Sequence, residues 1–264
     1  VRRGSQACGR APGSSWPDVD ALGAGELGRS SSERSGGRRT TLAAVQRIVI
    51  MAKAPRPGLA KTRLARASPI GADGAARLAR AFVLDTLAAC AELDAVETCV
   101  AYAPPDARAE FALLAPHSEL VEQPEGDLGV RLCAAFAQAF RAGATSVLAL
   151  GTDTPHVGSA RLRDAFARLA EADVVLGPAT DGGYWLVGLR APRPELFSGI
   201  AWSTPSVLAS TLHHAARAQL RVTLLDELVD IDEAPELFEL ARSAALDPRL
   251  CPATSAALKA LRLI

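Results

Sequence analysis

The sequence predicts an α/β fold with three layers, a Rossmann-like arrangement in which helices cover both faces of a mostly parallel central sheet. Strand-like and helix-like patterns alternate from Gln46 onward, as they do in such folds. The first strand, at residues 47–52, is a short apolar run that is typical of a strand buried on both faces. Apolar residues around Leu132 and Phe136 recur at the spacing of a helix's buried face.

The elements follow in chain order. We expect strands at residues 47–52, 96–103, 146–150, 174–176, 185–187 and 221–225. We expect helices at residues 75–91, 132–140, 162–169, 235–241 and 253–261. A further helix is expected to begin at Thr204, with Pro205 in the favoured first position. Ligands of such a fold bind beyond the carboxyl ends of the strands.

The composition disfavours several classes of partner. Lys and Arg together number 29, and so do Asp and Glu, so no net positive field is available to hold a nucleic acid backbone. No apolar run reaches the roughly 18 residues that span a bilayer. The N-terminal stretch lacks the apolar core of a secretory signal. We therefore expect a cytoplasmic protein that binds neither nucleic acid nor membrane, and the sequence carries no signal for an oligomeric state.

The cysteines are expected to be reduced packing residues. No two of them have the Cys-x-x-Cys spacing, and three lie in apolar patterns. The five are Cys8, Cys90, Cys99, Cys133 and Cys251.

Residues 1–44 differ in composition from the rest of the chain. They hold eight of the 21 glycines and show no sustained apolar periodicity. Such a segment cannot offset its ordering entropy by burial, so we expect a disordered Gly/Ser/Arg-rich tail. The alternative is a start-site artefact, with translation beginning near Val45. In either case we expect the folded domain to occupy residues 45–264.

The loop after the first strand is rich in cations. Lys53, Arg56, Lys61 and Arg63 lie within eleven residues, and Gly58 opens the loop. Cations, backbone amides and a following helix terminus are what a polyphosphate requires. This pattern favours phosphate binding over an incidental solvated loop, and we expect removal of Lys61 or Arg63 to weaken nucleotide binding with little effect on folding.

Two acidic segments predict a divalent metal site. Asp153 follows an apolar strand, and Asp230 and Asp232 lie near the last helices. Carboxylates brought together across strand ends can hold Mg²⁺ or Mn²⁺, with phosphate oxygens and water completing the coordination. The alternative for Asp153 is a turn cap before Thr154-Pro155.

A glycine turn follows the strand at 174–176. Gly182 and Gly183 allow a backbone to approach a sugar or base closely, Asp181 can accept hydrogen bonds from hydroxyls, and Tyr184 can stack. The alternative is a plain hairpin, since Asp-Gly and Gly-Gly are turn signals.

Two further segments combine helix starts with polar or aromatic groups. Gly126 and Asp127 precede the helix near Leu132, where they are candidate substrate contacts as well as turn residues. Trp202 precedes the predicted start at Thr204 and is a candidate acceptor contact beside a helix cap.

These motifs, taken in order, resemble the selenodomain-associated transferase family, a group of bacterial proteins in the glycosyltransferase A superfamily. The resemblance runs from about Arg47 to Leu240. It is carried by five segments: 51–64, 126–129 (Gly-Asp-Leu-Gly), 151–155 (Gly-Thr-Asp-Thr-Pro), 181–186 (Asp-Gly-Gly-Tyr-Trp-Leu) and 230–232 (Asp-Ile-Asp). The family is similar to the phospholactate and molybdenum-cofactor guanylyltransferases.

The resemblance implies a glycosyltransferase A fold, a nucleotide substrate and a divalent metal. It places Lys61 in the phosphate loop and Asp153 on the metal, with Asp230 or Asp232 as the second metal ligand. Asp181 is the candidate to orient or deprotonate an acceptor hydroxyl.

Two transferase reactions fit this set of residues. One moves a sugar from a nucleotide sugar to a small-molecule acceptor. The other joins a nucleoside triphosphate to a phosphorylated acceptor and releases pyrophosphate. A third alternative, of a different class, is a nucleotide-binding module without turnover.

Overall fold

The computed structural model describes residues 45–264. The predicted tail at residues 1–44, its alternative start site and Cys8 lie outside the described residues.

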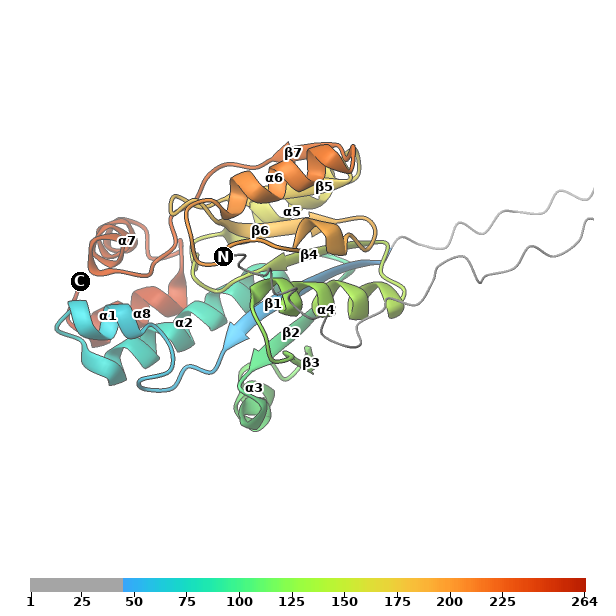
Figure 1. Ribbon diagram of the computed structural model, residues 1–264. Helices are drawn as coiled ribbons and strands as arrows, with labels where there is room; N and C mark the ends of the chain where they lie inside the picture. The colour runs from blue at the N-terminus through green and yellow to red at the C-terminus, as the bar shows by residue number, and fades with distance from the viewer. Residues whose placement is uncertain (1–44) are drawn as a thin grey trace, which may run out of the picture. The chain divides into compact units, whose positions relative to one another are not determined.

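A seven-stranded sheet forms the centre of the domain (Figure 1), in the order β3-β2-β1-β4-β6-β5-β7. The strands are β1 (Gln46–Lys53), β2 (Val96–Ala103), β3 (Glu119–Glu122), β4 (Ser146–Leu150), β5 (Val174–Pro178), β6 (Tyr184–Leu189) and β7 (Val222–Leu224). β6 runs antiparallel to both of its neighbours, and every other pair in the sheet is parallel. The sheet is therefore mostly parallel, as predicted.

Helices cover both faces of this sheet. They are α1 (Thr62–Ala67), α2 (Gly71–Ala91), α3 (Arg108–Leu114), α4 (Leu128–Arg141), α5 (Gly158–Leu169), α6 (Val207–Arg217), α7 (Ala234–Leu246) and α8 (Pro252–Ala260). Ile48 and Ile50 of β1 pack in one apolar cluster with residues of α2, α3 and α5. Val49 packs in another with residues of α4 and α6. Alternate β1 residues thus face opposite helix layers, which confirms the predicted three-layer α/β arrangement.

A third apolar cluster lies at the end of α2 that faces α1, α7 and α8 (Figure 1). Asp85 of α2 connects α2 to the start of α8 by hydrogen bonds. Its buried carboxylate accepts hydrogen bonds from the backbone N–H of Ala253 and of Thr254, both at 2.8 Å, and from the Thr254 hydroxyl at 2.6 Å. The first turn of α8 is therefore capped by a side chain distant in sequence.

Most predicted elements are present, with four differences. The short elements α1, α3 and β3 were not predicted, because each has seven residues or fewer and too little apolar periodicity to stand out. The expected helix start at Thr204 is wrong, since α6 begins at Val207. Thr204 instead belongs to a tight turn in which its hydroxyl donates to Ala201 O at 2.7 Å.

The four described cysteines are free, which confirms their predicted role as packing residues. Cys90, Cys99 and Cys251 are buried, and burial raises the pKa of each thiol to about 12. These side chains therefore stay protonated at neutral pH.

The strand order places a switch point between β1 and β4, at the centre of the sheet. The connection after β1 leads to β2 on one side, and the connection after β4 leads to β5 on the other side, so the two connections leave the carboxyl ends of β1 and β4 in opposite directions. Open α/β sheets bind ligands beyond the carboxyl ends at such a switch point. Among residues 45–264, no helix is long and apolar enough to cross a membrane.

Candidate active site

Lys61 lies at the centre of the polar residues beyond the carboxyl ends of β1 and β4. Its Nζ atom is 2.6 Å from Asp153 Oδ1 and 2.8 Å from Asp232 Oδ1, and it donates a hydrogen bond to Ile231 O at 2.9 Å. Nζ also lies 5.3 Å from the centroid of the Phe82 ring. An ammonium has three N–H donors, so these three oxygens use all of them.

Backbone contacts bring the three side chains together. Lys61 immediately precedes α1 and has a left-handed conformation, with φ of 50°. Leu228 N donates to Pro178 O, so the chain after β7 continues beside the end of β5. Ile231 N then donates to Asp153 O at 2.8 Å. The segment that carries Asp232 is therefore tied to the loop after β4.

The Lys61 side chain is only 6% exposed, whereas those of Asp153 and Asp232 are 47% and 42% exposed. Burial by itself lowers the pKa of the ammonium, but the two carboxylates outweigh burial and hold the pKa above its usual value. Lys61 is therefore a charged, buried residue. The expectation that its removal would have little effect on folding assumed a surface cation, and this assumption does not hold for Lys61.

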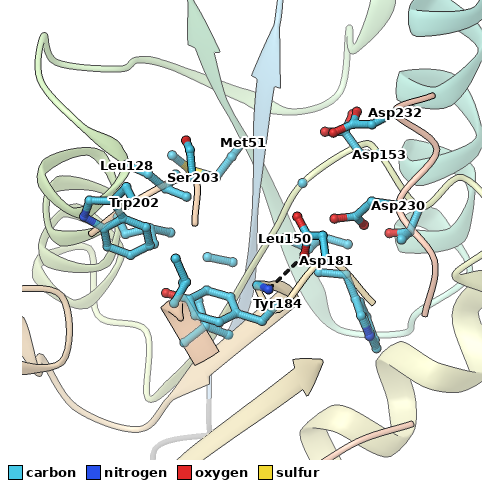
Figure 2. A pocket seen from close by; sticks show the side chains of 18 of the residues that line it. Met51, Leu128, Leu150, Asp153, Asp181, Tyr184, Trp202, Ser203, Asp230 and Asp232 are labelled. Atoms are coloured by element: carbon cyan, nitrogen blue, oxygen red, sulfur yellow. Dashed lines mark hydrogen bonds between the residues drawn. The ribbon is translucent and has the colours of Figure 1, made fainter. Parts of the chain in front are cut away.

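Asp230 lies in a more negative environment than the other aspartates. Burial, followed by the charges of Asp153, Asp181 and Asp232, raises the pKa of its carboxyl to about 7, although Lys61 acts in the opposite direction. Figure 2 shows Asp181 and Asp230 on the same side of one cavity. This pair lacks the ammonium that joins Asp153 and Asp232.

Two cavities meet at Asp153 and Asp232, which line both of them. The smaller, of about 230 Å³, is also lined by Lys53, Lys61 and Arg63, and we call it the cationic cavity. The larger, of about 350 Å³, we call the aspartate–aromatic cavity. Four aspartates line it, together with three Ser or Thr residues and a larger set of apolar and aromatic residues. The aspartates are Asp153, Asp181, Asp230 and Asp232, the hydroxyl residues are Thr154, Ser203 and Thr204, and the apolar and aromatic residues include Met51, Leu128, Leu132, Tyr184, Trp185 and Trp202.

Figure 2 shows that the aspartate–aromatic cavity has two unlike halves. The aspartates gather on one side, and Met51, Leu128 and Trp202 gather on the other. The rings of Tyr184 and Trp202 meet edge to face, with centroids 6.5 Å apart and an interplanar angle of 84°. Among the described residues, the buried Tyr184 hydroxyl has no hydrogen-bond partner.

Two glycines allow the segment at residues 200–205, which carries Trp202, to pack closely against the rest of the site. A Cβ at Gly129 would lie 2.7 Å from Phe197 O and 2.8 Å from Trp202 Nε1. A Cβ at Gly182, where φ is +87°, would lie 2.2 Å from Pro205 O. Gly182 therefore accommodates another part of the chain, and of the two glycines only Gly183 lines the cavity. A ligand contact at Gly182 stays a prediction.

Several predicted residues lie outside both cavities. Arg56 is paired with Asp106 at 2.8 Å and with Glu110 at 2.9 Å, so its charge is used within the fold. Asp127 caps α4 by accepting a hydrogen bond from Val130 N at 3.0 Å. Gly58 and Gly126 have positive φ angles and serve as turn residues. None of these four residues lines either cavity.

Lys53 and Arg63 fit the phosphate prediction better. Lys53 is the exposed last residue of β1. Arg63 is exposed as well, and its one described ion pair, to Glu233, is 3.9 Å long. Both side chains can therefore meet an anion from solvent without breaking a tight contact.

Sequence reasoning missed some residues of the site. Met51 and Leu128 line the cavity, as does Ser203, which has a φ of 61°. Met51 could have been found, because it lies near the carboxyl end of β1, where ligands of this fold bind, and its side chain faces the opposite side of the sheet from that of Ile50. Nothing in the sequence indicates the backbone angle of Ser203.

Two carboxylates offer a limited set of ligands for a metal ion. Within residues 45–264, no group of three or more His, Cys, Asp or Glu side chains is arranged to hold one. Asp153 and Asp232 are hard oxygen ligands that are nearly half exposed, as Mg²⁺ or Mn²⁺ requires. The pair fits an ion whose remaining ligands come from substrate phosphate and water.

A mostly parallel sheet, with carboxylates and cations gathered beyond its carboxyl ends, places the protein in the glycosyltransferase A class of α/β folds. The chain belongs to the family described as "Uncharacterized protein conserved in bacteria (DUF2064)", whose model matches residues 86–204. The name of the selenodomain-associated family stays a prediction.

Solved structures give the same fold. A "putative nucleotide-diphospho-sugar transferase" from Desulfovibrio desulfuricans G20 is 34% identical, with a TM-score of 0.77 over 83% of this chain and 96% of that chain. CMP:2-keto-3-deoxy-manno-octonic acid synthetase complexed with CTP is 14% identical, with a TM-score of 0.50, and the match covers 77% of this chain and 99% of that chain. The 4-diphosphocytidyl-2C-methyl-D-erythritol synthase of Anaerococcus prevotii DSM 20548 is 10% identical, with a TM-score of 0.50, and the match covers 81% of this chain and 96% of that chain. A comparison with curated protein sequences gives no match.

Proposed function

We propose that this protein is a transferase that moves a sugar from a nucleoside diphosphate to a small-molecule acceptor. The observation that carries the proposal is the position of Asp153 and Asp232, which line both the cationic cavity and the aspartate–aromatic cavity. A diphosphate on one side and a sugar on the other would place the breaking bond at these two carboxylates. The name of the 34% identical neighbour supports a nucleotide sugar as the donor.

The cationic cavity would bind the diphosphate. Lys53 and Arg63 are exposed and supply charge complementary to phosphate oxygens. Lys61 acts differently, because its three donors already hold Asp153, Asp232 and Ile231. It is a positioning residue that keeps two like charges together.

Asp153 and Asp232 would hold a divalent cation together with the donor. When bound, such an ion neutralises the negative charge that grows on the departing diphosphate. Asp232 is the second ligand in this proposal rather than Asp230, because Asp232 shares Lys61 with Asp153.

The aspartate–aromatic cavity would hold the sugar and the acceptor. An acceptor hydroxyl forms a new bond to the anomeric carbon, and the bond from that carbon to the diphosphate oxygen breaks. The hydroxyl proton passes to Asp181, whose exposed carboxylate lines the cavity. Carboxylate oxygens also hydrogen-bond well to sugar hydroxyls, which would orient both partners.

Nucleotidyl transfer is the second candidate, and the cationic cavity favours it equally, since a triphosphate needs the same charges. It would release pyrophosphate instead of a nucleoside diphosphate. A binding module without turnover would release neither.

Thermal unfolding with a nucleotide panel tests the proposal. A ligand that binds the native state raises the melting temperature by mass action. We expect a nucleoside diphosphate sugar with Mg²⁺ or Mn²⁺ to raise it, and an Arg63→Ala variant to lose most of this rise. An Arg66→Ala variant serves as the control, because Arg66 is exposed in the same helix and lines neither cavity. Stabilisation by triphosphates alone, with pyrophosphate as product, would favour the second candidate.

A further inference from the structure

The two cavities differ in the sign of their charge. Lys53, Lys61 and Arg63 line the cationic cavity. Four aspartates line the aspartate–aromatic cavity, and no Lys, Arg or His of the described residues does. The nearest ammonium, Lys61, lies behind Asp153 and Asp232 and is already bound to both.

An anion beside Asp181 and Asp230 would therefore meet the charge of Asp181 with no described Lys, Arg or His lining the cavity, because the divalent cation of the proposed function would lie at Asp153 and Asp232, on the border with the cationic cavity. Asp181 and Asp230 make no ion pair with Lys61 in the described part of the chain, and Figure 2 shows both on the acidic side of the cavity. Placing like charges together in a partly desolvated site disfavours binding strongly. A phosphate group would bind more favourably in the cationic cavity.

The other half of the cavity offers apolar contact. Trp202 and Tyr184 present ring surface, and Met51 and Leu128 lie on the same side (Figure 2). Such surfaces pack against the C–H face of a sugar ring or against another aromatic ring.

We infer that the acceptor carries no negative charge: it is a neutral or positively charged compound with a reactive hydroxyl and an apolar face. This inference rests on the proposed function and narrows it, because a phosphorylated acceptor would be disfavoured. In the transfer step the acceptor supplies its own hydroxyl oxygen, and its proton leaves to Asp181. No phosphate oxygen of the acceptor takes part.

A matched pair of ligands tests the inference. The full chain is loaded with a nucleoside diphosphate and Mg²⁺ and titrated with phenyl β-glucoside or with the 6-phosphate of the same compound. Calorimetry is expected to give at least tenfold weaker binding for the phosphate. Equal or tighter binding of the phosphate, or no binding of the neutral compound, would overturn the inference.

A charge placed in the cavity provides the second arm of the test. Leu128 is 43% exposed and lines the aspartate–aromatic cavity, so a Lys at this position adds a cation without altering an aspartate. The ratio of the affinities for the neutral and the phosphorylated compound is the quantity compared. We expect Leu128→Lys to reduce this ratio by about threefold or more, while Leu128→Met leaves the ratio unchanged. An unchanged ratio in Leu128→Lys would contradict the view that the charge of the cavity disfavours the phosphate. Failure of the proposed function is distinguishable, because the protein would then bind no nucleotide sugar and release no nucleoside diphosphate.

Discussion

Lys61 and Asp153 form a 2.6 Å ion pair between the start of α1 and the loop after β4. The same ammonium binds Asp232, so an internal cation holds together two carboxylates that would otherwise repel. A lysine that a sequence motif assigns to phosphate is, in the fold, a residue that organises the carboxylates.

Loss of this ammonium should destabilise the protein. In a Lys61→Met variant, Asp153 and Asp232 would face each other unpaired. Breaking a fully buried ion pair costs about 3–5 kcal/mol, and we expect about 2 kcal/mol here because both carboxylates are nearly half exposed. That corresponds to a melting temperature lower by roughly 4–8 °C. Added Mg²⁺ should restore more of this loss than it adds to the wild type, and an unchanged melting temperature would refute the organising role.

Asp230 should make stability fall as pH rises. Its pKa of about 7 in the folded protein lies above the ordinary value of 3.8, so the native state retains a proton that the unfolded state releases. Stability from this group is therefore present below pH 4 and is lost as pH rises toward 7 and beyond. An Asp230→Asn variant, which never carries the charge, should gain about 5 °C more in melting temperature at pH 8 than at pH 5. Melting curves of the wild type and of Asp230→Asn between pH 5 and pH 8 test this prediction. A gain in melting temperature that does not depend on pH would contradict it.

The two glycine turns should respond differently to a methyl group. Gly182 and Gly58 both have positive φ, but only at Gly182 would a Cβ meet another part of the chain, at 2.2 Å from Pro205 O. We expect Gly58→Ala to cost about 1 kcal/mol from backbone strain alone and Gly182→Ala to cost more than about 3 kcal/mol. Urea unfolding measures both. An equal loss of unfolding free energy in the two variants would show that the close approach of Pro205 does not exclude a side chain at Gly182.

Arg63 should contribute to donor binding and Arg56 should not. Arg63 lines the cationic cavity, whereas Arg56 is paired with Asp106 and Glu110 outside it. We expect Arg63→Ala to weaken the affinity for a nucleoside diphosphate by about tenfold, equivalent to about 1.4 kcal/mol, with Arg56→Ala within twofold of wild type. Calorimetric titration checks both, and the reverse order would move the phosphate site toward α3.

The sequence was sufficient to predict six of the seven strands and the meeting of two acidic segments. Strands such as β1 and β4 are continuous apolar runs, and this pattern is local in the chain. Because ligands bind beyond the strand ends, Asp153 was expected to meet Asp230 or Asp232, and the structure joins Asp153 to Asp232 through Lys61.

Other features of the site depend on contacts between distant residues and could not be predicted. Burial of Lys61 requires the left-handed start of α1 and the carbonyl of Ile231. Gly182 has the same sequence signature whether it approaches a ligand or, as found, the backbone of Pro205. The separation of Arg56 from Arg63 likewise depends on α3, which has too little periodicity to be predicted.

The identity of the released phosphate tests the central claim most directly. The full chain is incubated with Mg²⁺ or Mn²⁺, a panel of nucleoside diphosphate sugars and nucleoside triphosphates, and neutral acceptors, and the products are followed by phosphorus magnetic resonance. We predict a nucleoside diphosphate as product, lost in Asp153→Asn but kept in Asp164→Asn, whose aspartate pairs with Arg168 on the surface. Release of pyrophosphate, or full activity in Asp153→Asn, would contradict the account.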